Sequence, residues 1–345
     1  MAEHKLNLIE RIRRRPGMYV GDLCIRGIKT MLGCFFEDIL ENSSNKLDIN
    51  IDFKTNDIIA LFVKNLNTEL FIETVENLNI ENKIVPLGLP VIIALSEQVN
   101  LKIISNSSVL TLTSTKGDYE FKNKLITKKA DSIDLEFKID RTIFNEVELN
   151  YESFNQFFRK YTFINTNCRI ISHDNRTDIK QTNLFDYPRG LSQQLDLKIA
   201  EQLYGKSFFR LDLSTKIDNY EYQICISYQD IWLSQTIIQT YANYDELLNG
   251  GSLEKGILDG LYLAIKEIAY KREIVIDRRK LKEELILLAV IKGNNFHFCG
   301  STKVEIYMPK VRKKIKEFVC EKALLYLSEN KHIENQILNK MTKYE

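Results

Sequence analysis

The most specific string in the sequence is Arg13-Arg14-Arg15-Pro16-Gly17-Met18-Tyr19-Val20-Gly21-Asp22. By itself it predicts a basic turn, because proline and glycine fix the backbone of tight turns. The next segment, 28–42, carries apolar residues at three- and four-residue intervals, which predicts an amphipathic helix. A short apolar stretch at 91–95 predicts a helix beneath several β-rich runs, which cover 47–53, 58–63, 101–104, 109–112 and 133–139. Helices packed on a sheet in this way predict an α+β fold.

A second block begins at about residue 198 and predicts another unit of the same class. Its pattern contains strands at 211–213 and 222–228, the loop Asn249-Gly250-Gly251, a helix over 253–268 and a buried strand over 285–291. A strand, a long helix and a strand in that order predict a right-handed βαβ unit. Two helical patterns follow, beginning near Pro309, which suits a first helical turn, and ending beyond Met341. We therefore expect two domains, 1–197 and 198–345.

Composition and charge exclude several classes of protein. The 345 residues are 44% hydrophobic and 28% charged, which excludes a disordered or collagen-like chain. Lys plus Arg number 48 against 47 for Asp plus Glu, so the overall charge does not indicate nucleic acid or a membrane as a partner. The six cysteines form no CxxC pair, which favours free thiols in a reducing cytoplasm and no structural zinc. No apolar run approaches membrane-spanning length, so we expect a cytoplasmic protein.

The opening stretch resembles the R-K-R-P-G-M-Y-I-G opening of the B subunits of bacterial type II topoisomerases, DNA gyrase and topoisomerase IV. Further matches follow in the same order along the chain. In the first block, Ile39-Leu40-Glu41-Asn42 resembles the end of the family's first ATP-site helix. Ala94-Leu95-Ser96 resembles the helix after the ATP lid, and Phe163-Ile164-Asn165 resembles a later strand start. In the second block, Gly250-Gly251-Ser252 with Gly256 resembles G-G-T-H-x-x-G-F. Lys282-Glu283-Glu284-Leu285 resembles R-E-G-L, and Phe298 with Ser301-Thr302-Lys303 resembles F-x-x-Q-T-K. The resemblance implies a reduced GHKL-type ATPase domain, a helix-on-sheet sandwich, followed by a ribosomal-S5-like transducer domain.

The resemblance also implies residues for ATP hydrolysis. The family places a carboxylate that activates water and an amide that holds Mg²⁺ four residues apart, on one helix face. Asn42 matches the amide and would be the Mg²⁺ ligand, while Asp38 stands where the family has a longer glutamate. A displacement of about 1 Å can reduce a rate on the order of a hundredfold. Glu37 has the right length but lies about 100° around the helix. A solvated acidic helix face explains these carboxylates equally well.

Two other parts of the family's nucleotide site are reduced. The family reads adenine with D-x-G-x-G, but the corresponding stretch here, 63–68, holds no acid and no glycine. Asn65 could accept a hydrogen bond from adenine, although the close backbone approach that glycine permits is lost. The phosphate lid ends in G-G-L-H-G-V-G in the family, whereas 84–90 keeps only Gly88 and contains two prolines that remove amide donors. The resemblance implies ATP and Mg²⁺ as cofactors, and these losses favour a chain that uses neither.

Two features of the second block bear on ligands. Lys303 matches the transducer lysine that contacts the γ-phosphate in the family, and Ser301 stands where the family has a longer glutamine. A solvated loop lysine explains Lys303 equally well. Basic residues also gather on one expected helix, where a solvated face is favoured over a DNA contact; they are Lys310, Arg312, Lys313, Lys314 and Lys316.

Two functions of different classes follow from these observations. The first is an ATP-operated clamp, the ATPase subunit of a type II topoisomerase-like complex whose other chains cleave DNA. We expect no cleavage by this chain alone, because it contains no D-x-D cluster or E-G-D-S-x stretch of a Toprim domain. The second is a non-catalytic descendant that keeps the fold as a binding module for a topoisomerase-like subunit, for DNA or for a second copy of itself. The missing adenine acid and glycines favour the second function.

Overall fold

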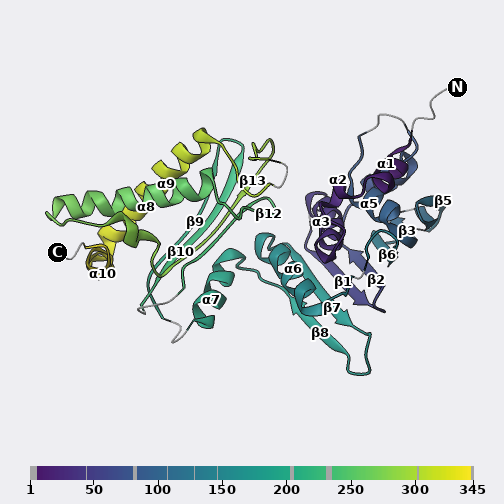
Figure 1. Cartoon of the computed structure of the whole chain (residues 1–345), viewed down its shortest axis with the longest axis horizontal. Helices are drawn as coiled ribbons and strands as arrows, with labels where there is room; N and C mark the ends of the chain where they lie inside the picture. Colours follow the sequence, from purple (N-terminus) through teal and green to yellow (C-terminus); the bar gives the residue numbers. More distant parts are fainter. Residues whose placement is uncertain are drawn as a thin grey trace. The chain divides into compact units, whose positions relative to one another are not determined.

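The computed structural model describes residues 6–43, 45–80, 84–106, 108–127, 129–145, 147–202, 206–230, 235–300 and 303–342. The chain divides into two compact units, Met1–Pro188 and Arg189–Glu345 (Figure 1). The sequence analysis places the boundary after residue 197 instead. The division lies earlier because α7 (Leu191–Glu201) packs on β10 (Tyr220–Gln229) and β13 (Leu285–Lys292), two strands of the second unit.

The first unit is an α+β sandwich. Its helices are α1 (Leu8–Arg14), α2 (Gly17–Val20), α3 (Ile25–Glu41), α4 (Glu69–Glu76), α5 (Gly88–Leu95) and α6 (Tyr151–Ile164). Its strands are β1 (Leu47–Phe53), β2 (Ile58–Lys64), β3 (Ser96–Ser105), β4 (Ser108–Thr115), β5 (Asp118–Leu125), β6 (Ser132–Ile139), β7 (Cys168–Asp174) and β8 (Gln181–Phe185). The described strands form one eight-stranded sheet in the order β5-β4-β3-β6-β2-β1-β7-β8.

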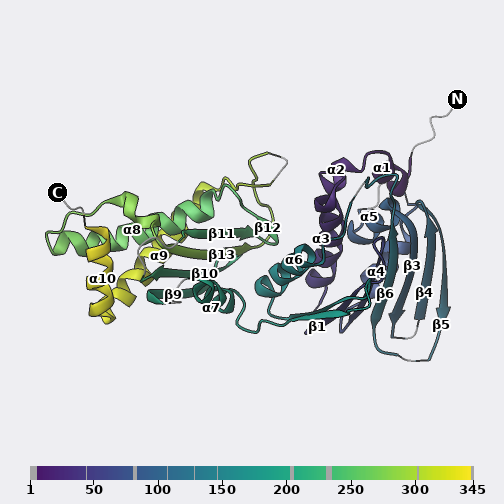
Figure 2. The same cartoon turned by 60° about the horizontal axis from the view of Figure 1, so that its bottom comes forward.

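One face of this sheet carries the core of the unit. Burial alternates along β1 and β2, so every second side chain points toward the helices and the others face solvent. The helices α3 and α6 lie side by side over the buried face (Figure 2). Phe36 of α3 contacts Phe158 and Tyr161 of α6 edge to face, and Phe53 of β1 contacts Phe154 in the same way. These aromatic contacts fix the position of α3 on the sheet, and with it the acidic end of that helix.

The helix α5 is buried on all sides. Every residue from Gly88 to Leu95 is buried, and the helix packs against both α1 and α3. An all-round apolar sequence is what a helix enclosed in a core requires. The expected helix at 91–95 is therefore present and begins three residues earlier. By contrast, Phe163-Ile164-Asn165 does not start a strand: Phe163 and Ile164 end α6, and β7 begins at Cys168.

The second unit is also α+β, with helices on a mixed sheet. Its elements are α7, β9 (Ser207–Ile217), β10, β11 (Ile237–Ala242), β12 (Asp245–Glu246), α8 (Ser252–Lys271), a 3₁₀ turn (Arg278–Lys282), β13, α9 (Pro309–Glu329) and α10 (Lys331–Met341). The described strands form a five-stranded sheet in the order β12-β11-β13-β10-β9. A βαβ unit is present, but its first strand is β11, which pairs parallel to β13, whereas β10 pairs antiparallel to β13.

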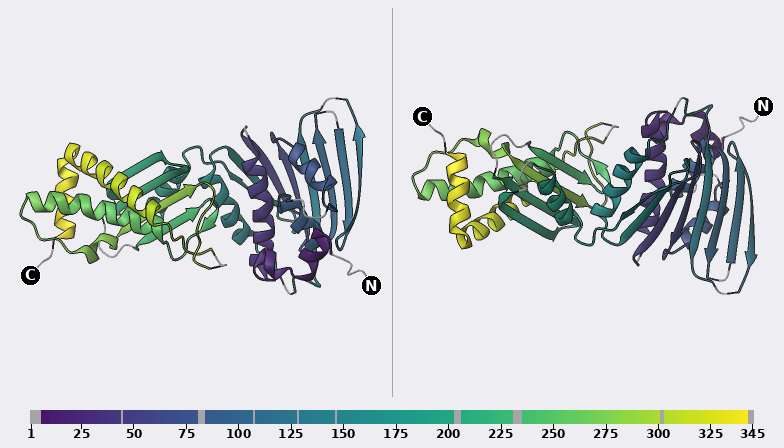
Figure 3. Two further views of the ribbon diagram at one scale, coloured as in Figure 1. Left: turned by 90° about the horizontal axis from the view of Figure 1, so that it is seen from above. Right: turned by 90° about the horizontal axis from the view of Figure 1, so that it is seen from below.

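Two helices cover one face of the second sheet. Figure 3 shows α8 and α9 lying together along it. They pack closely because two glycines of α8 face α9: a Cβ on Gly256 would lie 2.2 Å from Ile315 Cγ2, and one on Gly260 would lie 2.5 Å from the backbone oxygen of Lys316. Gly256 thus has a packing role that explains its place in the sequence pattern. In the described part of the chain, no helix is both long and apolar enough to cross a membrane.

Candidate functional site

The candidate site of the first unit lies where α3 meets the start of α5. The carboxylate of Asp38 accepts a hydrogen bond from the Gly88 backbone N–H at 2.7 Å. A Cβ on Gly88 would lie 2.5 Å from Asp38 Oδ2 and 2.6 Å from Phe35 Cα, so only glycine permits this approach. The first N–H groups of a helix have no partner within the helix and carry partial positive charge. Asp38 therefore caps α5 from another helix, and this contact joins residues 50 positions apart in the chain.

The environment of Asp38 disfavours its charge. The pKa of Asp38 is raised to about 6: burial and the negative charge of Glu41 raise it, and the hydrogen bond from Gly88 lowers it in part. At neutral pH the group is still mostly ionised and retains the ability to accept a proton from water. One of its oxygens, however, already accepts the hydrogen bond from Gly88 N–H at the start of α5.

The start of α5 has few donors left for a phosphate. Gly88 N–H is bound by Asp38, Val91 N–H donates to Leu87 O at 2.9 Å, and Pro90 has no N–H. Leu89 is the one residue of this first turn whose N–H has no described acceptor, and it is buried. A helix N-terminus binds anions through several converging N–H groups. This one offers almost none.

Asn42 lies at the C-terminal end of the helix that holds Asp38. Its side-chain Nδ2 donates to the backbone oxygen of Asp38 at 2.8 Å, so the amide closes the last turn of α3. An amide oxygen is an acceptable Mg²⁺ ligand, and Oδ1 of Asn42 is not used in this contact. Within the described residues, no group of three or more His, Cys, Asp or Glu side chains is placed to hold a metal ion.

Asn65 joins the end of β2 to the segment after α3. Its Nδ2 donates to Lys46 O at 3.1 Å, and its own backbone oxygen accepts from Ser43 Oγ at 3.4 Å. Its φ of 64° is in the left-handed region, which asparagine tolerates better than most residues. Two neighbours, Leu66 and Thr68, are buried, and the Thr68 hydroxyl donates to Ile104 O at 3.0 Å. Leu66 and Thr68 are therefore part of the packed interior.

Lys303 belongs to the second unit and is held there. Its Nζ forms an ion pair with Asp245 Oδ2 at 2.9 Å and lies 5.5 Å from the centre of the Phe298 ring. Ser301, the expected companion of Lys303, lies outside the described residues. The basic helix expected at the end of the chain is α9, where Arg312 and Lys314 form ion pairs with Asp259 and Asp218.

The sequence analysis missed a residue that positions α5. Arg13, from the opening stretch, donates to Ala94 O at the end of α5 at 2.7 Å and forms an ion pair with Asp140, whose side chain is 1% exposed. Burial would raise the pKa of Asp140, but hydrogen bonds from Thr142 and Arg13 outweigh burial and hold the pKa below its ordinary value. The signal in the sequence was the arginine-rich stretch itself, which gave no indication of its partners.

Comparisons with known proteins agree with this architecture. Residues 189–345 match the sequence model of the DNA gyrase B family. Over 367 aligned residues, which cover 96% of the chain, the sequence is 24% identical to the DNA gyrase B protein of Campylobacter jejuni and 21% identical to that of Staphylococcus aureus. These alignments cover 46% and 56% of the two relatives, so the chain spans about half the length of the curated relatives it matches.

Solved structures show the same fold. The 43K ATPase domain of Thermus thermophilus gyrase B, determined in complex with an aminocoumarin, is similar with a TM-score of 0.80 and 17% identity, covering 97% of this chain and 94% of that one. The B-subunit of the DNA gyrase from Myxococcus xanthus gives a TM-score of 0.78 and 17% identity, covering 97% of this chain and 100% of that one.

The sandwich of the first unit has a GHKL-type fold, and together with the sheet-and-helix second unit it has the α+β fold of these gyrase B structures. The chain is therefore similar in sequence, at low identity, to DNA gyrase B proteins, and similar in fold to a solved gyrase B ATPase domain.

Proposed function

We propose that this chain is a gyrase B-like module that does not turn over ATP and acts by binding a protein or DNA partner. The observation that carries the proposal is the start of α5, where Asp38 occupies the Gly88 N–H and Pro90 removes another donor. A triphosphate needs converging N–H groups or positive side chains to balance its charge. The residues at this helix end do not fit a bound Mg²⁺-ATP.

The adenine side of the site supports the same proposal. Asn65 is exposed, and its side-chain nitrogen already donates to Lys46 O. Function depends on the residues of a site and not on the fold that carries them. A GHKL-type fold without these groups is suited to binding a macromolecular partner, such as a topoisomerase-like subunit, a second copy of the chain, or DNA. The cytoplasm remains the compartment we propose, in keeping with the six cysteines, which are free thiols.

A second function, an ATP-operated clamp within a topoisomerase-like complex, is favoured by one observation. Asp38 has a raised pKa of about 6 and lies one helical turn before Asn42. A carboxylate of that pKa is well matched to accept a proton near neutral pH. In that case the Gly88–Asp38 hydrogen bond would have to break when nucleotide binds.

Isothermal titration with Mg²⁺ and a non-hydrolysable ATP analogue distinguishes the two functions. We expect no heat of binding at millimolar nucleotide; micromolar binding would favour the clamp. Phosphate release would then be measured for the wild type, Asp38→Ala and Asp38→Glu at saturating Mg²⁺-ATP. We expect no turnover in any of the three, because restoring the carboxylate length returns at most roughly a hundred- to ten-thousandfold in rate and cannot act on nucleotide that does not bind. A wild-type rate that disappears in Asp38→Ala would refute the proposal.

A further inference from the structure

The strand β5 forms one edge of the first-unit sheet. It pairs with β4 on one side, and no described strand lies on its other side. In an antiparallel pair, alternate residues direct both backbone groups away from the neighbouring strand. All residues of β5 except Tyr119 are exposed, so these backbone groups are accessible to another chain. An edge of this kind is a template for an added strand.

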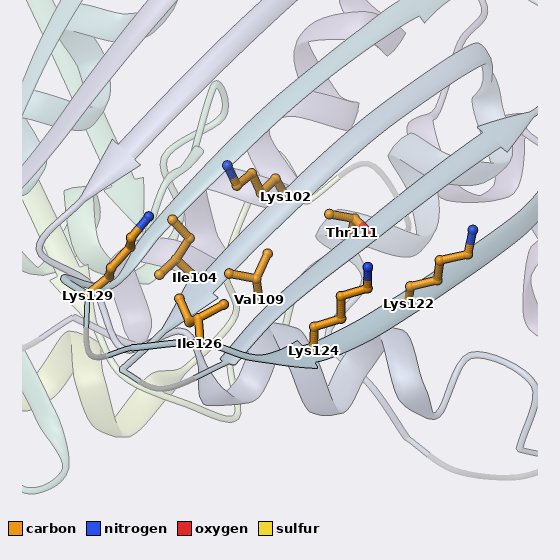
Figure 4. A pocket seen from close by; sticks show the side chains of 8 residues that line it. All are labelled: Lys102, Ile104, Val109, Thr111, Lys122, Lys124, Ile126 and Lys129. Carbon is orange, nitrogen blue, oxygen red and sulfur yellow. The ribbon is translucent and has the colours of Figure 1, made fainter.

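The outward face of this edge is strongly basic. The pairing of Thr111 with Lys122, and of Val109 with Lys124, places these side chains on the face away from the helices. A hollow of about 330 Å³ lies there. Figure 4 labels the eight side chains that line it: Lys102, Lys122, Lys124, Lys129, Ile104, Val109, Thr111 and Ile126. No described carboxylate forms an ion pair with any of these four lysines, whereas the nearby Lys54 and Lys138 are paired with Glu136 and Glu97.

Acidic residues mark the limits of this basic patch. Asp134 of β6 lies opposite Lys102 in the register, and Glu120 precedes Lys122 by two positions on the same face of β5. The positive charge is therefore concentrated at the end of β5 that leads into Ile126. An occupant must place negative charge at that end.

The other face of β5 is apolar at the same end. Phe121 is 37% exposed and Leu125 is 88% exposed, and both alternate with Lys122 and Lys124 along the strand. Between them, Asn123 donates to Glu76 of α4 at 3.0 Å, which places this face on the helix side of the sheet. Exposed apolar groups beside accessible backbone groups indicate a surface suited to a partner.

Protection against self-association explains only part of this arrangement. Lysines on an edge strand discourage pairing with a second identical edge. They do not explain the exposed Leu125, nor the basic Lys102, which lies on β3, two strands away from the edge. Two identical edges would repel each other through their lysines, whereas a strand with negative charge would be attracted. An edge with this charge and with exposed apolar side chains is therefore selective for a strand of opposite charge.

We propose that β5 is a docking edge for an extended acidic peptide segment of a partner protein. The segment adds as a strand beside β5; its alternate side chains are carboxylates that face the basic hollow, and the intervening side chains are apolar and cover Phe121 and Leu125. The inference rests on the proposal that the chain acts as a binding module, and it names the chemistry of the partner. Among the described residues that line the hollow, none has an aromatic side chain on which a nucleobase could stack, which favours a peptide over single-stranded nucleic acid.

The test uses the full chain and a fluorescent peptide of alternating aspartate or glutamate and valine, seven residues long. Fluorescence anisotropy would compare it with a peptide of the same composition in which acids and valines are grouped in two blocks. A third peptide keeps the alternating sequence but is N-methylated at every second residue. It is made in two versions, and each version blocks the N–H groups along one edge of the peptide strand. We expect the alternating peptide to bind most tightly and one methylated version to lose binding, because strand addition needs both the alternation and the backbone donors.

Paired variants locate the site. Lys122→Glu/Lys124→Glu should weaken binding roughly ten- to hundredfold, because two attractive cross-strand pairs become repulsive. The control Lys310→Glu/Lys313→Glu makes the same change of charge on exposed residues of α9 and should leave binding unchanged. A peptide with lysine in place of the acids should bind the first variant better than the wild type. Circular dichroism would show that both variants are folded.

Several outcomes would overturn the inference. If the block peptide binds as tightly as the alternating peptide, or if both methylated versions bind as tightly as the unmethylated one, the peptide is held by its charge and does not add as a strand. Full competition by a 20-base-pair DNA duplex that depends on the same two lysines would assign the patch to nucleic acid. No binding at millimolar peptide would also overturn it. None of these results concerns ATP, so a failure here is distinct from the finding of ATP turnover that would refute the proposed function.

Discussion

Replacing Asp38 with asparagine should stabilise the first unit at neutral pH. Burial raises the pKa of Asp38 from 3.8 to about 6, which means that the ionised carboxylate is disfavoured in the folded state. Asparagine has nearly the same shape, and its Oδ1 can still accept the hydrogen bond from Gly88 N–H. The variant keeps the cap on α5 and removes the buried charge.

The shift in pKa gives the size and the sign of the effect. A shift of roughly two units corresponds to about 3 kcal/mol, at 1.36 kcal/mol per unit. An acid with a raised folded-state pKa destabilises the fold where it is ionised in both states. The destabilisation is absent below about pH 4, grows between pH 4 and 6, and is complete above pH 6. Asp38→Asn should therefore match the wild type at pH 4 and exceed its stability by about 2–3 kcal/mol at pH 8.

The measurement is urea unfolding of the full chain, followed by hydrogen–deuterium exchange of peptides from α3 and α5. Peptides from the second unit serve as the internal reference, because Asp38 belongs to the first unit. Glu41→Gln is the matched control, since it removes only the neighbouring charge that raises the Asp38 pKa and should give a smaller gain. A gain that is equal at pH 4 and pH 8, or no gain at pH 8, would refute the assignment of a buried, charged Asp38.

The remaining predictions concern packing around the same helices and in the second unit. Gly88→Ala should lower the free energy of unfolding by about 1–3 kcal/mol, because the added Cβ would meet α3 at 2.5–2.6 Å; Gly17→Ala, which meets nothing within 4 Å, should change it by less than about 1 kcal/mol. Equal stability of these two variants in urea would contradict the close approach of α5 to α3. Arg13→Met should destabilise the first unit by about 3–5 kcal/mol, since it leaves the buried Asp140 without its cation; thermal unfolding of this variant alongside Arg13→Lys, which should recover part of the loss, checks it. Gly256→Ala should destabilise the second unit by about 1–3 kcal/mol through a clash with α9, and unchanged hydrogen exchange in α8 and α9 would contradict this.

Much of the fold could be predicted from local patterns. The apolar spacing over 28–42 corresponds to α3, the alternating run over 47–53 is β1, and the run over 285–291 is β13. Each of these segments buries a continuous face, so its apolar residues recur with a fixed period that can be recognised in the sequence. The strand β5 left none, because nearly all of its side chains are exposed and only its backbone pairs with β4. The first strand of the βαβ unit was misassigned for a related reason, since the pattern of burial does not say which strand is parallel to which.

Sequence patterns alone indicate the class of fold and the order of the two units, and they show that 63–68 and 84–90 lack residues that the resembled family uses to bind nucleotide. Missing glycines, a missing adenine acid and two prolines are visible without any structure, because each removes a backbone group or a charge that is local in the chain. Only the tertiary structure decided that Asp38 serves the start of α5, that Arg13 joins the end of α5 to Asp140, and that basic and apolar side chains meet along β5. These contacts join residues far apart in sequence, and their geometry depends on how helices and strands pack, which no local spacing of residue types records.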